Sequence, residues 1–323
     1  MTVLRYNHAE LDEDTAENLA TGVTKLPYTV EARPPRDEDT PSKLQNLADG
    51  VLEYQTKYLG LKNTSPTIAY EIRRTTPGKL QFQYAAPTKR LERKIRTHLT
   101  NDTPHVELKE GVNGLPIREE DTVGGGLLTA GRTDWYPLKT SFDQPPVDSV
   151  VAALHRHAMQ NTRFVIQILF RPVIGQPLRR YYWRKRAYQR IGHLRREKEK
   201  LWGSRPPTPR EKKQADAIEN KAGSPRFHVS IRLLIINAAE YTPSRVKEIS
   251  GAFNTYENPE TGQYLNATTV TPFRRSQILS FAQAVQRREF QGWSQKFQAT
   301  KDELSALLSL PNRKQDNIQN AQP

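Results

Sequence analysis

The chain has 323 residues, with 49 Lys and Arg against 35 Asp and Glu, and a formal net charge of +14. It contains no Cys, which excludes disulfide bonds and cysteine-ligated zinc or iron–sulfur sites. No apolar run approaches the roughly 18 residues of a membrane-spanning helix, and the N-terminus lacks the pattern of a secretory signal. These features predict a cytoplasmic protein, soluble or peripheral at the inner face of the membrane.

The N-terminal third alternates between strand and helix patterns. Residues 1–24 form an acidic segment with one short helix. From residue 25 to residue 122, strands are indicated by alternating apolar residues and helices by apolar residues every three or four positions. In chain order the pattern predicts a strand at 25–34, a helix at 44–60, strands at 67–74 and 80–87, a helix at 88–99 and a strand at 105–111. This β-α-β-β-α-β order is typical of a ferredoxin-like subdomain.

The same order of elements follows a second time. Residues 123–126 (VGGG) are predicted to be a linker. The pattern then predicts a strand at 127–140, a helix at 147–160, strands at 163–173 and 226–238, a helix at 242–256 and a strand at 264–272. The fold class is therefore α+β, with two tandem ferredoxin-like subdomains at 25–122 and 123–273. C-terminal helices at 274–311 and a polar tail at 312–323 complete the chain.

A basic insertion separates the two long strands of the second subdomain. Residues 176–222 hold 15 Lys and Arg against 5 Asp and Glu, so +10 of the net charge of +14 is concentrated there. Their pattern predicts a helical hairpin that bends at 204–209. Aromatic residues lie among the cations, a combination that suits phosphates and unpaired bases. The predicted binding residues are Arg179, Arg180, Trp183, Arg184, Lys185, Arg186, Arg190, Arg195, Arg196, Lys198 and Lys200. A protein partner, an anionic lipid surface or a solvated hairpin remain alternatives.

No catalytic motif accompanies these elements. The Gly78-Lys79 pair lies in a predicted hairpin turn and is followed by Leu, so it is not a P-loop. His155 and His157 suggest the metal site of rolling-circle or relaxase nucleases, with Tyr181 or Tyr182 as nucleophile. That signature places a hydrophobic residue between the histidines and sets them on a strand, whereas here Arg intervenes and the pattern is helical. We therefore expect no catalytic residue, metal or cofactor.

The segments FVIQILFRPV, YYWRKRAYQR and FHVSIRLLIINA, followed by a helix beginning TPSRV, resemble a known protein family. The likeness is to the N-terminal, non-motor region of type IV secretion or conjugative DNA-transfer ATPases, of the archaeal and bacterial type with a HerA/FtsK-like motor. TKDELSALLSLPN resembles the ELAxLxHLPN segment that precedes the motor in that family, with Ser309 at the usual His position. The resemblance covers roughly residues 147–312.

The resemblance implies a role beside a motor. In that family this region precedes a hexameric RecA-like ATPase, and this chain stops near residue 323, where the motor begins. We therefore expect a non-catalytic module of a DNA-transfer apparatus, as a stand-alone homologue, the product of a split gene or a truncated product. The implied partners are DNA, a P-loop motor ATPase or membrane channel component, and further copies in an oligomer. The alternatives are a metal-dependent nicking enzyme and a protein-docking scaffold.

Overall fold

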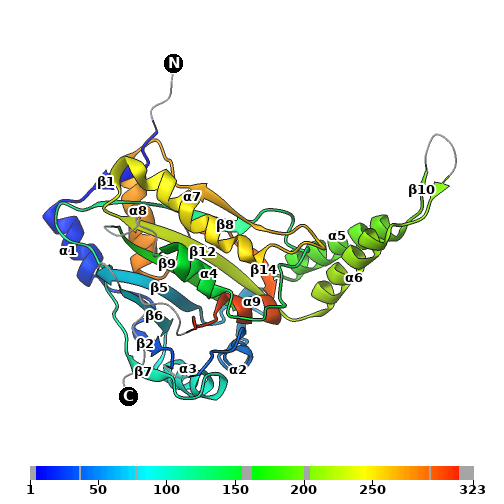
Figure 1. The fold of residues 1–323 in the computed structure, drawn as a ribbon, viewed down its shortest axis with the longest axis horizontal. Coiled ribbons are helices and arrows are strands. Elements are labelled where there is room, and N and C mark those ends of the chain that lie inside the picture. Colours follow the sequence, from blue (N-terminus) through cyan, green and yellow to red (C-terminus); the bar gives the residue numbers. More distant parts are fainter. Residues whose placement is uncertain are drawn as a thin grey trace.

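The structure is a computed structural model that describes residues 5–35, 38–76, 79–154, 162–199, 204–290 and 292–312. A ten-stranded antiparallel sheet lies at its centre, with two small ribbons apart from it (Figure 1). The sheet strands are β1 (His8–Glu10), β2 (Tyr28–Arg33), β5 (Ile68–Thr76), β6 (Lys79–Ala86), β7 (Glu107–Glu110), β8 (Thr122–Ala130), β9 (Arg163–Pro172), β12 (Arg226–Ile236), β13 (Leu265–Thr269) and β14 (Phe297–Thr300). The ribbons pair β3 (Thr56–Lys57) with β4 (Lys62–Asn63), and β10 (Lys198–Glu199) with β11 (Ser204–Arg205).

The helices of the described residues cover both faces of this sheet or project from its end. They are α1 (Glu13–Thr21), α2 (Gln45–Gly50), α3 (Lys89–Asp102), α4 (Val147–Leu154), α5 (Pro177–Arg195), α6 (Pro209–Gly223), α7 (Thr242–Ala252), α8 (Arg275–Gln286) and α9 (Lys301–Leu307). Short 3-10 helices, Ala239–Tyr241 and Phe253–Tyr256, flank α7. None of these helices is long and apolar enough to cross a membrane.

The strands join in the order β1-β8-β12-β9-β5-β6-β2-β7, with β13 also paired to β8 and β14 to β12. Within the first predicted subdomain the order is β7-β2-β6-β5, and within the second it is β13-β8-β12-β9. The two sets meet where β5 pairs with β9, from Ile68 opposite Phe170 to Arg74 opposite Phe164. One continuous antiparallel sheet therefore runs through both halves of the chain. The predicted hairpin of β5 and β6 is confirmed.

The glycine-rich segment 123–126 is part of strand β8, so its prediction as a linker is wrong. A Cβ on Gly125 would lie 2.0 Å from the Leu233 carbonyl oxygen and 2.7 Å from the Phe281 ring of α8. A Cβ on Gly126 would lie 2.6 Å from Val246 of α7. Glycine is required because α7 and α8 approach this strand closely from opposite faces.

Three further predictions need correction. The helix at 44–60 is only α2, which ends at Gly50 against the ring of His98 and gives way to the β3–β4 ribbon. The region of C-terminal helices also holds strand β14, which pairs with β12. The acidic segment contributes β1, which extends the sheet beside β8. Short strands of this kind carry too few residues for a periodic pattern and form where a neighbouring edge offers hydrogen bonds.

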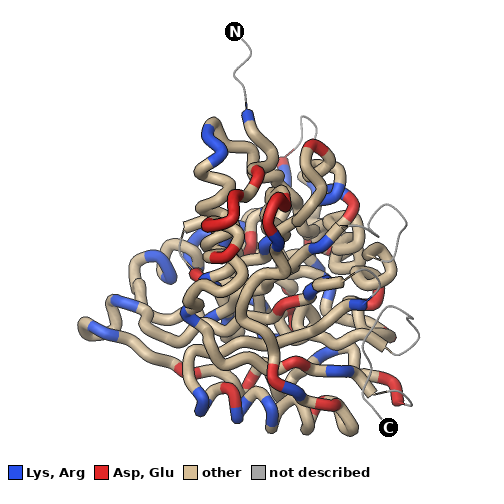
Figure 2. Tube along the Cα trace, turned by 90° about the vertical axis from the view of Figure 1, so that its left-hand side faces the viewer, with Lys and Arg blue, Asp and Glu red and all other residues tan. Residues whose placement is uncertain are grey.

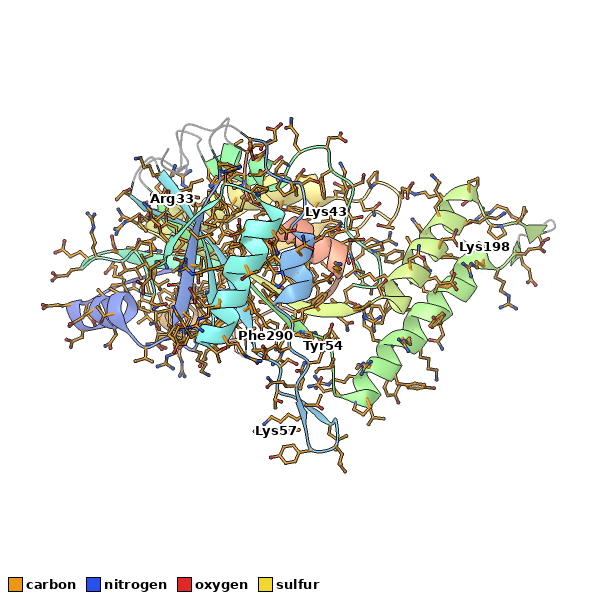
Figure 3. The ribbon with its side chains drawn as sticks, turned by 90° about the horizontal axis from the view of Figure 1, so that it is seen from below. Arg33, Lys43, Tyr54, Lys57, Lys198 and Phe290 are labelled. Atoms are coloured by element: carbon orange, nitrogen blue, oxygen red, sulfur yellow. The ribbon has the colours of Figure 1, made fainter. Side chains whose placement is uncertain are left out.

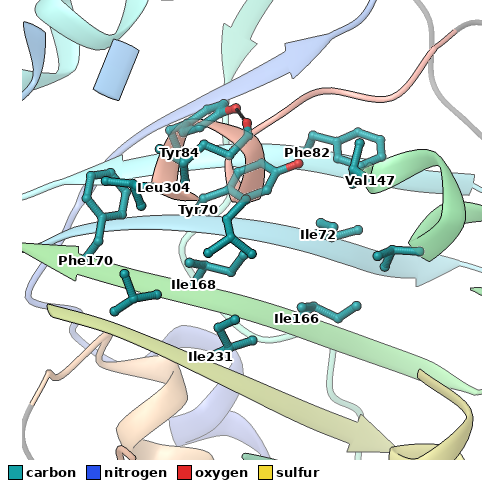
Figure 4. Packing of buried hydrophobic residues seen from close by; sticks show 14 of the residues in the cluster. Tyr70, Ile72, Phe82, Tyr84, Val147, Ile166, Ile168, Phe170, Ile231 and Leu304 are labelled. Atoms are coloured by element: carbon teal, nitrogen blue, oxygen red, sulfur yellow. Dashed lines mark hydrogen bonds between the residues drawn. The ribbon is translucent and has the colours of Figure 1, made fainter. Parts of the chain in front are cut away.

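One face of the sheet carries the main apolar core under α2, α3, α4, α7 and α9. Figure 4 shows Tyr70 and Tyr84 at its centre, beneath Leu304 of α9. Their rings stack with centroids 4.8 Å apart. Their hydroxyls donate to the carbonyl oxygens of Ser309 (2.9 Å) and Leu308 (2.7 Å). These bonds fix the segment after α9 over the middle of the sheet, and they satisfy two buried hydroxyls that would otherwise be costly.

The opposite face has a buried polar row across its middle. Gln83 of β6, Glu71 of β5, Gln167 of β9 and Arg232 of β12 are register neighbours in adjacent strands. Arg288, just after α8, donates to Glu71 through Nε (2.9 Å) and Nη2 (3.0 Å). Gln83 (2.6 Å) and Gln167 (2.9 Å) also donate to the Glu71 carboxylate. Helix α8 ends at Gln286, and Arg288 has a left-handed φ of 54° as it turns toward Glu71.

Candidate nucleic-acid interface

The basic insertion forms an arm, defined as residues 176–223, that projects from one end of the sheet. Helices α5 and α6 lie side by side along it, with Lys198 near its outer end (Figure 3). The β10–β11 ribbon joins them there. The seam between the helices is apolar and consists of Ala187, Ile191, Leu194, Ala215, Ile218 and Ala222, together with Tyr136. The predicted helical hairpin is therefore present, and an apolar seam joins its two helices.

The root of the arm is attached through polar contacts. Trp183 is half-buried, and its Nε1 donates to Asp134 Oδ1 at 2.6 Å. The guanidinium of Arg226 lies 4.1 Å from the Trp183 ring, in a cation–π contact. Arg190 Nε donates to the hydroxyl of Tyr136 at 2.6 Å. Trp183 and Arg190, both predicted as binding residues, are thus occupied within the fold.

Two other predicted binding residues are paired within the arm. Arg195 contacts Asp216 (2.7 Å) and Glu219 (2.5 Å) of α6. Lys198 pairs with Glu211, which also accepts from the backbone N–H of Thr208 in the capping box of α6. The Lys198 hydrogen bond is the first cause of a lowered Glu211 pKa. The charges of Arg195 and Lys198 are therefore matched locally, which weakens their attraction for an external anion.

The other predicted binding residues that the structure describes are exposed. We call them the free arm cations because none lies within ion-pair distance of a carboxylate in the described part of the chain. They are Arg179, Arg180, Arg184, Lys185, Arg186 and Arg196. Lys200 lies outside the described residues. Tyr181 and Tyr182 are exposed among them, with ring centroids 6.0 Å apart in an edge-to-face arrangement. The first half of α5 thus offers unmatched positive charge and aromatic faces together.

A second group of basic residues lies where the arm meets the sheet, and sequence reasoning missed it. These sheet-end residues are Arg171 of β9, Arg226 and His228 of β12, and Lys296 before β14. Arg171 and His228 are register partners. The Phe290 ring has the Arg171 guanidinium 4.7 Å and the Lys296 ammonium 4.9 Å from its centroid. In the sequence, this group could have been found from the basic residues at the ends of two otherwise apolar strands.

The sheet-end residues repel one another and the start of α5. Burial, and then the positive charges of Arg171 and Lys296, lowers the pKa of His228 to about 4. Burial and Arg171 also lower the pKa of Lys296, and Arg179 of α5 contributes to both effects. Burial lowers the pKa of Arg226 to about 10, with Arg184 and Arg180 adding to the effect. Among the described residues, no carboxylate lies within ion-pair distance of this group. Like charges gathered in this way make a favourable site for a phosphate, because its charge would relieve their repulsion.

The rest of the surface differs in charge pattern. Figure 2 looks at the end of the molecule away from the arm, and there Lys and Arg alternate with Asp and Glu along the chain. The ion pairs include Arg90 with Glu53 (2.6 Å) and Lys109 with Glu107 (2.9 Å). At that end opposite charges are interspersed, whereas the free arm cations have no ion-pair partner in the part of the chain that the structure describes.

The candidate nuclease residues cannot be placed. His155 and His157 lie outside the described residues, so their position relative to Tyr181 and Tyr182 is not part of the description. Among the residues that are described, no group of three or more His, Asp or Glu side chains is arranged to hold a metal ion.

The pKa of His228 makes the site testable by pH. A phosphate bound nearby would raise this pKa, so DNA affinity is expected to rise by about threefold to tenfold between pH 7 and pH 5 at constant ionic strength. His228→Gln should remove most of that rise. Fluorescence anisotropy with a labelled oligonucleotide at both pH values measures it. His105→Gln, an exposed histidine elsewhere, is the control, and an unchanged pH dependence in His228→Gln would place the anion away from β12.

Comparison with known protein families matches the whole chain to one family model. A family model described as a domain of unknown function matches residues 1–323. No curated protein matches the chain.

Proposed function

The chain belongs to the DUF8128 family, and from the geometry of its arm we propose that it is a non-catalytic DNA-binding module. The observation that carries this proposal is the run of free arm cations on the first half of α5, next to the sheet-end residues. Cations on one surface displace counterions from a phosphate backbone, and the exposed tyrosines of α5 offer faces to unpaired bases. Single-stranded DNA, or the single-stranded part of a DNA being transferred, fits both features.

The proposal extends to the setting of this module. The resemblance to the non-motor region of conjugative and type IV secretion ATPases suggests that the arm holds DNA beside a P-loop motor supplied by another chain. We also propose that the fold consists of two ferredoxin-like units, divided near residue 123. The strand orders β7-β2-β6-β5 and β13-β8-β12-β9 support this division, since corresponding elements occupy corresponding positions in the two sets.

The salt dependence of DNA binding tests the proposal. Replacing Arg179, Arg180 and Arg184 by Gln is expected to weaken binding by about tenfold to a hundredfold at 0.1 M salt. The slope of log K against log[salt] should also fall by about 2 to 3, because each lost phosphate contact removes about 0.7 to 0.9. Fluorescence anisotropy between 0.05 and 0.3 M salt measures both quantities.

The control variant must remove the same number of positive charges as the test variant. Arg93→Gln, Lys247→Gln and Arg274→Gln combined remove three exposed cations from α3, α7 and the start of α8. That variant should keep the wild-type slope to within about 1. Equal losses in both variants would mean that DNA responds only to net charge. The arm would then serve as a protein-docking element, and DNA would not be its ligand.

A further inference from the structure

The ribbon of β3 and β4 forms a protruding tip with large apolar side chains in water. Leu59 is fully exposed, with a relative accessibility of 105%, and Tyr58 (71%) and Leu61 (59%) flank it. Figure 3 shows the ribbon leaving the body of the protein, with Lys57 on its projecting part. Scattered exposed apolar residues are common, but three within four positions at a loop end mark an interaction site.

The backbone holds these side chains outward. Tyr58 (φ 54°) and Leu59 (φ 53°) have left-handed backbone conformations, followed by Gly60 (φ 86°). Consecutive left-handed conformations are unfavourable for Tyr and Leu, which have side chains that clash with their own backbone there. A turn made of Gly or Asn would avoid this strain. The chain instead has bulky apolar residues at a strained, exposed position, which favours a role in contact with something outside the chain.

The tip is fixed against the start of the arm. The backbone N–H of Gln176 donates to the Leu61 carbonyl at 3.1 Å, and Asn63 Nδ2 donates to the Pro172 carbonyl at 2.7 Å. Gly175 packs so closely that an added Cβ would lie 3.0 Å from the Asn63 nitrogen. The first turns of α5 add exposed Leu178, Tyr181 and Tyr182 at this corner. Segments more than a hundred residues apart in sequence thus meet at this corner, and each carries exposed apolar side chains.

Cations surround this surface. Lys57 and Lys62 lie on the two strands of the ribbon and are exposed, and Arg179 and Lys185 are exposed on α5. None of the four has a carboxylate within ion-pair distance in the parts of the chain that are described. The tip and the start of α5 therefore combine exposed apolar and aromatic side chains with exposed basic residues.

We propose that this tip, together with the first turns of α5, docks on a membrane surface that carries anionic lipid. Leu59 and Leu61 would enter the boundary between headgroups and acyl chains, the tyrosines would lie at the interface, and the lysines would meet lipid phosphates. Aliphatic side chains contribute nothing to base stacking, so DNA does not account for them. A narrow convex tip also buries less than the roughly 800 Å² per partner of a stable protein interface, whereas a bilayer adapts to its shape.

Vesicle binding tests this inference separately from DNA binding. The full chain is expected to co-sediment with vesicles of phosphatidylcholine and phosphatidylglycerol (7:3) and to bind pure phosphatidylcholine at least about tenfold more weakly. Leu59→Asn with Leu61→Asn should reduce binding to the anionic vesicles by about tenfold or more, since the apolar contact is lost. Asn tolerates a left-handed φ, so this variant should fold. Its DNA affinity should stay within about twofold of wild type, because both changes are uncharged.

The control replaces exposed apolar residues elsewhere, Val23→Asn with Val112→Asn, and should bind vesicles as wild type does. In a second measurement, Leu59→Trp should show a blue-shifted emission with anionic vesicles and quenching by brominated lipid. Failure of the wild-type chain to bind anionic vesicles, or equal binding by the Asn variant, would overturn the proposal. So would self-association in sedimentation that the Asn variant abolishes, because the tip would then be a contact between copies.

Discussion

Replacing Glu71 by Gln is expected to lower the free energy of unfolding at pH 7 by about 3 to 5 kcal/mol. Glu71 is 2% exposed and receives two hydrogen bonds from Arg288, one from Gln167 and one from Gln83. The substitution leaves the Arg288 guanidinium buried without its counter-charge, and the neutral amide places an N–H group where donors already point. Chemical denaturation with circular dichroism measures the change.

The same variant should also lose a pH dependence. Burial by itself would raise the pKa of Glu71, but the charge and hydrogen bonds of Arg288 outweigh it and lower the pKa from 4.5 to about 2. The stabilisation is therefore complete above pH 4.5 and is lost as the pH falls from 4.5 toward 2. Wild type should lose about 3 kcal/mol across this interval through Glu71, and Glu71→Gln should not.

An exposed carboxylate of the same sheet provides the comparison. Glu110→Gln, on the edge strand β7, should change the stability at pH 7 by less than about 0.5 kcal/mol and keep the wild-type acid sensitivity. If Glu71→Gln and wild type lost stability in parallel between pH 4.5 and pH 2, the ionised Glu71 carboxylate would not be what holds Arg288 in place.

The second large loss of stability is expected when the buried ion pair between the arm and α9 is broken. Lys221 Nζ of α6 lies 2.9 Å from Glu303 Oε1, and the two side chains are 1% and 0% exposed. Glu303 also accepts from the backbone N–H of Leu138 (2.7 Å) and, in the capping box of α9, from that of Thr300 (2.6 Å). Glu303→Ala should lower the free energy of unfolding by about 3 to 5 kcal/mol, because Lys221 keeps a buried charge and the cap is lost.

The same helix offers a matched exposed pair. Lys213 lies 3.0 Å from Glu260, with both side chains more than half exposed, and Glu260→Ala should cost no more than about 1 kcal/mol. The double variant Lys221→Met with Glu303→Gln should be more stable than Glu303→Ala, since no charge is left unpaired. Thermal unfolding of wild type, Glu303→Ala, Glu260→Ala and the double variant gives their order of stability. Equal losses for Glu303→Ala and Glu260→Ala would show that the root of the arm is open to water.

The sequence determined the elements with a strong local pattern. The hairpin of β5 and β6 follows from apolar alternation, and the long strands β9 and β12 follow from nearly continuous apolar runs. The capping box at Thr300 follows from local sequence, because the free N–H groups at the start of a helix need side-chain acceptors. The concentration of positive charge in residues 176–222 is likewise a property of composition. These features depend on neighbours in the chain, so they can be inferred without a fold.

Only the tertiary structure decided which charges are free. The sequence cannot distinguish Arg195, which faces Asp216 across the helix seam, from Arg184, which faces solvent. It also could not show that Arg171 and His228 would meet beside the arm. These outcomes depend on strand register and helix packing between residues far apart in the chain.

The same reason explains the errors in secondary structure. Gly124 to Gly126 disfavour a strand by local propensity, yet close approach of two helices requires glycine in β8. The helical pattern after Gly50 gives way to a ribbon attached to Pro172 and Gln176, which no local signal connects to it. Local sequence determined the long strands, the caps and the charged arm. Long-range contacts decided the single sheet, the buried ion pairs and the exposed tip, because their energies come from partners brought together by folding.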